Sequence, residues 1–197
     1  MYRLLIPLVL LFGCQMVQKS PHYPIPKSQL LKCQGDTSQV QVEYLRKDQD
    51  YDLVQLQTDR AKYVFGKEPW QVISSISRLI LIDDKHEIRQ EVIEGDLSDI
   101  MTFPEGKVYA GKIRETNPSG TLIREFSIEV KPPIQYESPH YGKMEVIPFH
   151  EKMWGGKWSS DLLLYFSKEM GTKVYFKYRS DTLERECHLA QSSGTPP

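Results

Sequence analysis

An alternation of apolar and polar residues over Leu122–Val130 most constrains how this chain can fold. Phe126, Ile128 and Val130 occupy every second position, and Glu or Ser stands between them. Successive side chains of a strand point to opposite faces of a sheet. The stretch therefore indicates a β-strand with one buried and one polar face.

Shorter segments with strand character recur along the chain, separated by turns rich in Gly, Pro and Asp. They span residues 40–44, 53–56, 62–65, 79–82, 87–93, 99–103, 107–115, 143–147, 162–166, 173–178 and 185–189. Asn117–Gly120 has Pro at its second position and Gly at its fourth, as in a tight turn. These features predict hairpins and an antiparallel sheet.

The same pattern predicts an all-β domain over residues 30–190, followed by a flexible tail over 191–197. We expect an antiparallel β-sandwich, with a β-barrel as the alternative, because both architectures use short strands joined by turns. Trp70, Ile73 and Ile76 are spaced three residues apart after Pro69, which favours one short helix or turn there. We expect no other helix.

The N-terminus carries a single charge, Arg3, followed by a short apolar run that ends in Leu11-Phe12-Gly13-Cys14. This run resembles the lipobox signal of bacterial lipoproteins. At about 1.5 Å per residue in a helix, the run is too short to span a membrane. The resemblance implies removal of residues 1–13 and acylation of Cys14. An ordinary secretory peptide cut elsewhere, or a buried first strand of a cytosolic fold, is the alternative.

A lipidated Cys14 implies a protein of the cell envelope, anchored to a membrane through two or three acyl chains. In a Gram-negative cell, Gln15 after the cysteine favours the outer membrane, on its periplasmic face or at the surface. Pro21, Pro24 and Pro26 predict that residues 14–29 form an extended tether.

With Cys14 assigned to lipid, Cys33 and Cys187 remain near the two ends of the domain. An even number of cysteines in an oxidising compartment indicates one disulfide. The alternative is two buried free thiols. A disulfide would require the first and last strands to be neighbours, with Cα atoms within about 7 Å.

Composition and motifs argue against several functional classes. The formal net charge is −1, which does not favour nucleic acid as a partner. The five histidines form no HExxH motif, and no G-x-S-x-G motif occurs. His150 with Glu151, and His140 nearby in sequence, is the best cluster. We therefore expect no metal site, no cofactor and a non-catalytic protein.

Aromatic residues supply the candidate binding surface. Trp154 and Trp158 flank Gly155-Gly156 and could form a stacking platform for a sugar or a peptide, which Tyr136, His140 and Tyr141 could extend. The alternative is that one tryptophan belongs to the core and the other covers an edge of the fold.

The sequence thus favours a membrane-anchored lipoprotein whose β domain binds an envelope protein or a cell-wall glycan. One alternative is a hydrolase of envelope polymers that uses His140 or His150 with a carboxylate. The other is a structural subunit of an envelope assembly.

Overall fold

The computed structural model describes residues 26–35, 39–48, 51–58, 61–83 and 85–193. The predicted signal peptide, the predicted lipidation site Cys14 and most of the predicted tether lie outside these residues. β1 begins at Ser28, inside the stretch expected to be tether, and β13 continues to Ser193, inside the expected tail.

The described chain forms one antiparallel sheet of 13 strands. The strands are β1 (Ser28–Gly35), β2 (Gln39–Asp48), β3 (Tyr51–Thr58), β4 (Lys62–Lys67), β5 (Leu79–Ile82), β6 (His86–Glu94), β7 (Val108–Asn117), β8 (Gly120–Val130), β9 (Ile134–Ser138), β10 (Gly142–Gly155), β11 (Trp158–Ser167), β12 (Thr172–Ser180) and β13 (Glu184–Ser193). Two 3₁₀ turns, η1 (Pro69–Ile73) and η2 (Ile100–Thr102), lie in the connections. Residues 99–103 were expected to be a strand and instead contain η2.

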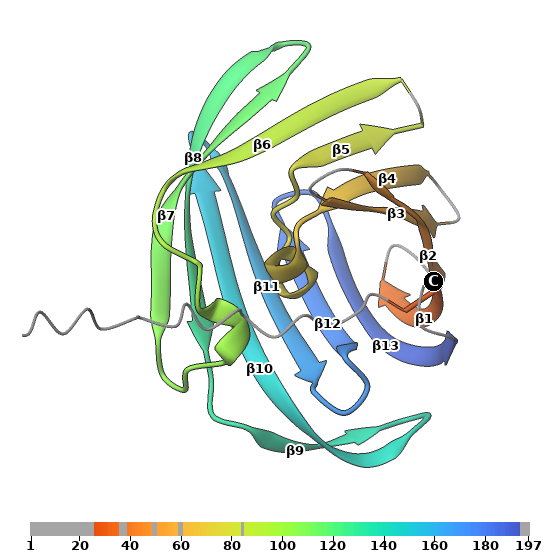
Figure 1. Ribbon diagram of the computed structural model, residues 1–197. Coiled ribbons are helices and arrows are strands. Elements are labelled where there is room, and N and C mark those ends of the chain that lie inside the picture. Colours follow the sequence, from red (N-terminus) through yellow and green to blue (C-terminus); the bar gives the residue numbers. More distant parts are fainter. Residues whose placement is uncertain (1–25, 36–38, 49–50, 59–60, 84, 194–197) are drawn as a thin grey trace, which may run out of the picture.

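The sheet closes on itself, because β10 pairs with β8 on one side and with β11 on the other. Twelve strands therefore form a ring, and β9 pairs with β10 outside it (Figure 1). The predicted sandwich is wrong and its alternative, the β-barrel, is confirmed. Both architectures require the same alternation along each strand, so the sequence pattern could not distinguish them.

Three predictions of local structure are confirmed. Phe126, Ile128 and Val130 are all buried, as the alternation in β8 predicted. The turn at Asn117–Gly120 joins β7 to β8, where Asn117 pairs with Gly120. The short helix expected after Pro69 is η1.

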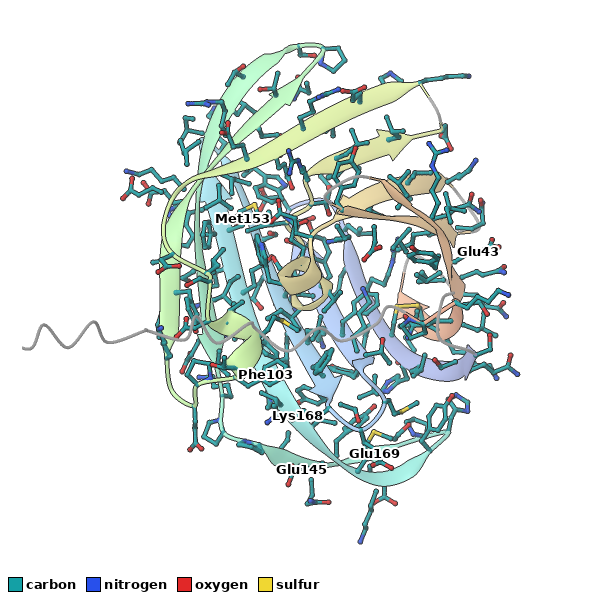
Figure 2. The ribbon with its side chains drawn as sticks, in the orientation of Figure 1. Glu43, Phe103, Glu145, Met153, Lys168 and Glu169 are labelled. Carbon is teal, nitrogen blue, oxygen red and sulfur yellow. A yellow bond between two sulfur atoms is a disulfide. The ribbon has the colours of Figure 1, made fainter. Side chains whose placement is uncertain are left out.

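The barrel interior is filled by side chains and also by inserted chain. A ring of about eight strands is just wide enough for side chains to fill, and a wider ring leaves space. Phe103, which follows η2, packs in the interior against Phe149 and Phe166 at centroid distances of 5.7 and 5.4 Å. Figure 2 shows Phe103 and Met153 among the interior side chains, whereas Glu43 and Glu145 project outwards.

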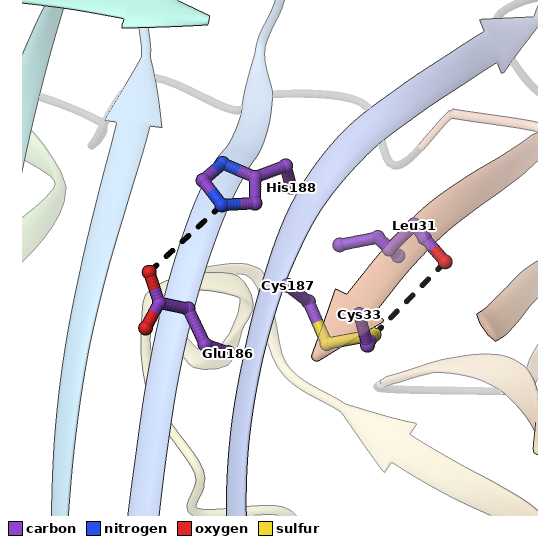
Figure 3. The surroundings of a disulfide bond; sticks show 5 residues. All are labelled: Leu31, Cys33, Glu186, Cys187 and His188. Atoms are coloured by element: carbon purple, nitrogen blue, oxygen red, sulfur yellow. Dashed lines mark hydrogen bonds and ion pairs between the residues drawn. A yellow bond between two sulfur atoms is a disulfide. The ribbon is translucent and has the colours of Figure 1, made fainter. Parts of the chain in front are cut away.

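The two ends of the barrel domain meet at the predicted disulfide. Cys33 on β1 faces Cys187 on β13 in the sheet register, and their Cα atoms lie 4.0 Å apart. Cys187 is fully buried, and the neighbouring His188 points to the opposite face of β13 (Figure 3). The prediction that the first and last strands are neighbours is confirmed.

Candidate functional site in the barrel interior

The connection between β4 and β5 turns into the barrel and lies within its interior (Figure 1). A capping arrangement starts the turn: the Glu68 N–H donates to Gln71 Oε1 at 2.8 Å. Trp70 Nε1 donates to Glu68 Oε2 at 3.0 Å. Ile73 and Ile76 are buried in the core. We call residues 69–77 the plug, because this segment occupies space that the strands alone would leave open.

Glu151 fastens the plug to the barrel wall. It lies on β10 between Phe149 and Met153 and points inwards, with 1% of its surface exposed. Its carboxylate accepts hydrogen bonds from the Ser74 and Ser75 hydroxyls, and from the Ser75 N–H at 3.1 and 3.2 Å. Burial raises the pKa of Glu151, and these hydrogen bonds oppose the rise.

Lys67, at the end of β4, holds the plug from the other side. Its ammonium donates to the carbonyls of Ser74 at 3.1 Å and Ile76 at 2.8 Å. Its Nζ also lies 5.5 Å from the centroid of the Phe65 ring. Burial lowers the pKa of Lys67 to about 7; the nearby charge of Lys173 adds to the effect, and Glu151 opposes it. This cation therefore titrates near neutral pH.

A cavity of about 350 Å³ lies between the plug and the inner faces of β2–β4 and β11–β13. Its apolar lining consists of Val42, Val54, Leu56, Phe65, Val72, Leu162, Phe176 and Leu183, with Pro26 where the described chain begins. Of the described residues that line it, the three charged ones are Lys67, Lys173 and Arg185, and all are basic. We call this space the interior cavity.

Lys173 has no hydrogen-bond or ion-pair partner among the described residues. Its Nζ lies 5.7 Å from the centroid of the Phe176 ring, on the same inner face of β12. Burial lowers the pKa of Lys173. A desolvated cation without a counter-ion carries a free-energy cost, which a bound anion would offset.

A larger hollow of about 980 Å³ lies between the plug and strands β6 and β7. Its charges are mixed and paired within the chain. Arg78 lies 3.5 Å from Glu68, and Arg114 lies 2.8 Å from Glu91. The interior cavity is the better candidate for a ligand site, because its lining is more apolar and its charge has one sign.

The structure places the two tryptophans of the predicted stacking platform on opposite faces of the barrel wall. Trp158 pairs with Gly155, packs against the interior core and lies under the Arg124 guanidinium at 4.3 Å. Trp154 is 40% exposed on the outside and donates to Glu125 at 2.9 Å. They do not form one stacking platform. Trp158, the first residue of β11, pairs with Gly155, and Trp154 precedes Gly155 on β10 and so points to the opposite side of the wall.

The other residues of the predicted binding surface belong to the β9–β10 hairpin. Tyr136 shares a 2.6 Å hydrogen bond with His188 Nδ1 and packs edge-on against Tyr165. His140 and Tyr141 are exposed at the turn of this hairpin. Tyr136 thus packs the hairpin over β11–β13, while the two turn residues stay accessible.

The structure also divides the residues of the sequence cluster around residue 150. His150 lies on the outer face of β10, with Nε2 2.9 Å from Asp161 Oδ2. Glu151 points to the interior instead. Among the described residues, no group of three or more His, Cys, Asp or Glu side chains is placed to hold a metal ion. None of the described helices is long and apolar enough to span a membrane.

The inward orientation of the charged residues Glu151 and Lys67 was not predicted from the sequence. Glu151 stands between Phe149 and Met153 in the alternation of β10, and Lys67 lies two residues after Phe65 in β4. In each case a charged residue stands on the face of the strand where the residues two positions away are apolar. That interruption is the signal that could have identified them.

Comparisons with known proteins bear on the fold. No family model matches the chain, and no curated protein sequence matches it. The crystal structure of the hypothetical lipoprotein YmcC from Escherichia coli K12 is similar, with a TM-score of 0.52 and 10% identity over 87% of this chain and 89% of that one. A protein from Bacteroides fragilis that is described as exported and as having a YmcC-like fold gives a TM-score of 0.48 and 9% identity over 88% of this chain and 100% of that one. The first likeness shows a shared fold.

Proposed function

We propose that this chain is a lipid-anchored binding protein of the cell envelope that holds a small, largely apolar ligand in its interior cavity. The cavity itself carries the proposal. Its volume of about 350 Å³ lies within the range of about 300–1,000 Å³ typical of ligand sites. Its lining combines apolar side chains with a few polar groups, which is the usual composition of such sites.

Two observations support the envelope anchor. Leu11-Phe12-Gly13-Cys14 resembles a lipobox, and the YmcC structure with the shared fold is described as a lipoprotein. Pro26, which lines the cavity, comes twelve residues after Cys14. Twelve residues span at most about 40 Å, so an acylated Cys14 would keep the cavity close to the membrane surface.

Titration with aminoanthracene, a neutral fluorophore, tests the binding site. We expect its fluorescence to rise on binding to the wild-type protein. Leu56→Trp, which puts a larger side chain into the cavity, should weaken binding at least tenfold. Leu45→Trp is the matched control, because Leu45 is 44% exposed on the outside. No saturable binding, or equal binding by both variants, would contradict the proposal.

Mass spectrometry of the membrane-extracted protein tests the anchor. We expect loss of residues 1–13 and a diacyl or triacyl addition on Cys14. A Cys14→Ala variant should then leave the membrane fraction. A chain that still begins at Met1, without acyl groups, would overturn this part of the proposal.

A second candidate function concerns the outer wall around Trp154, where an envelope protein or a glycan could bind. A groove there is lined by Trp154, Lys152, Asp161, Arg179 and Asp181. An exposed aromatic ring beside polar and charged groups suits stacking against a sugar. If this candidate holds, the wild-type protein should co-sediment with isolated peptidoglycan and Trp154→Ala should not. Equal co-sedimentation of both would count against it.

A further inference from the structure

We infer that the ligand of the interior cavity is a single-chain amphiphile with an anionic head, such as a fatty-acid carboxylate. The inference rests on the proposed binding function and names the chemical class of its ligand. The chain would lie among Val54, Leu56 and Phe176, and the head would lie beside Lys67 and Lys173.

The apolar part of the cavity fixes the shape of the ligand. Strands β2, β3 and β4 contribute one apolar wall, and Leu162 and Phe176 contribute the facing wall. At about 350 Å³ the cavity is at the small end of ligand sites, which suits one acyl chain better than two. Burying each methylene of such a chain contributes about 0.8 kcal/mol.

The charged part of the cavity fixes the sign of the head group. Glu151, the acid whose charge acts on Lys67, does not line the cavity, and the Ser74 and Ser75 groups occupy its carboxylate. Lys67 uses two of its three N–H groups on plug carbonyls. Lys173 has no hydrogen-bond or ion-pair partner among the described residues. An anion would accept hydrogen bonds from both ammonium groups and compensate their desolvation.

The site should couple ligand binding to proton uptake. Lys67 has a pKa of about 7, and the charges that face it are those of Lys173 and Glu151. A bound anion favours the protonated ammonium, so above pH 7 binding must draw in a proton. The affinity for a carboxylate should therefore rise as pH falls from 8 to 6.5, by up to about tenfold per pH unit. The carboxylate itself stays ionised in this range.

Displacement of aminoanthracene by three amphiphiles of equal chain length tests the inference. At pH 7 we expect dodecanoate to compete at least tenfold better than neutral dodecanol. The cation dodecyltrimethylammonium should compete least. If dodecanol equals dodecanoate, or if the cation competes best, the inference is overturned. In that case aminoanthracene binding still stands, so the proposed function survives its failure.

Charge-removing variants locate the head group. Lys173→Met keeps the length of the side chain and should abolish the preference for dodecanoate over dodecanol, both measured by displacement of aminoanthracene. Lys67→Met should remove most of the pH dependence. Lys152→Met, exposed on the outside of β10, is the control and should change neither. Because Lys67 also holds the plug, circular dichroism checks that each variant is folded, and Lys173→Met alone decides the position of the head group if Lys67→Met unfolds. An unchanged preference in Lys173→Met would place the anion elsewhere and overturn the assignment.

Discussion

Ser75, on the plug, donates its backbone N–H to the Glu151 carboxylate on the barrel wall at 3.1 Å, across 76 residues of sequence. This link fixes a loop inside a ring of twelve strands. It also separates the packed core from the interior cavity, because Ser74 and Ser75 line that cavity on one side. The buried carboxylate therefore shapes the candidate site without facing the ligand.

Replacing Glu151 with Ala should destabilise the barrel markedly. The change leaves the Ser74 and Ser75 donors buried without their acceptor, and each such group costs about 1–3 kcal/mol. We expect the free energy of unfolding in urea to fall by about 3 kcal/mol. Glu137→Ala, on the exposed face of β9, should change it by less than about 0.5 kcal/mol. Similar effects of the two changes would show that Glu151 does not hold the plug.

Removing the disulfide should cost several kcal/mol. The bridge joins residues 154 positions apart, and the chain-entropy model gives about 5 kcal/mol for a loop of that length. We expect the Cys33→Ala/Cys187→Ala double variant to unfold at lower urea concentration than the oxidised wild type. Reductant should shift the wild type to the same midpoint and leave the variant unmoved. If reductant does not change the urea midpoint of the wild-type protein, even when it is added to the unfolded chain, the disulfide is contradicted.

Gly111→Ala should disturb the contact between β6 and β7. A Cβ at this position would overlap the Glu94 carbonyl oxygen and lie 2.8 Å from Phe126 Cζ. The Glu94 backbone cannot move away from the new Cβ as a flexible side chain could. We therefore expect the free energy of unfolding to fall by about 2–3 kcal/mol. Thermal denaturation measures this. An unchanged melting temperature would show that β6 and β7 accommodate the added Cβ without a loss of stability, and would contradict the prediction.

Lys67 should make the stability depend on pH near neutrality. Its pKa is about 7 in the folded protein and near 10.5 when unfolded, so the unfolded chain binds more protons between these values. Stability should therefore rise with pH above 7 and be lost as pH falls through 7. Urea unfolding from pH 6 to pH 9 should show this rise in the wild type and a flatter profile in Lys67→Met. Parallel profiles would contradict a depressed pKa.

Strand positions were predictable because each depends on neighbours in sequence. The alternation around Phe126 and the turn at Asn117–Gly120 appear in the structure as expected. Residues 99–103 were predicted to form a strand, but their apolar positions belong to a 3₁₀ turn that packs into the interior. Apolar runs of this length are too short to show a periodicity that distinguishes a strand from a turn.

The candidate site was harder to predict than the strands. Trp154 and Trp158 are close in sequence, but the hairpin register turns one outwards and the other inwards. Lys67, Glu151 and Lys173 are far apart in sequence and meet only because the ring closes and the plug enters it. Their inward orientation could be inferred from their strands, whereas their proximity could not.

The sequence by itself determined the all-β class and the hairpin turns, and it favoured the pairing of Cys33 with Cys187 that the structure contains. Alternation and turn chemistry act over a few residues, and the cysteine count admits few pairings. The tertiary structure alone decided that β10 joins β8 to β11, which closes a barrel instead of stacking two sheets. That choice depends on long-range pairing and on a plug that fills the wide interior. The same choice created the interior cavity and gave it a basic lining.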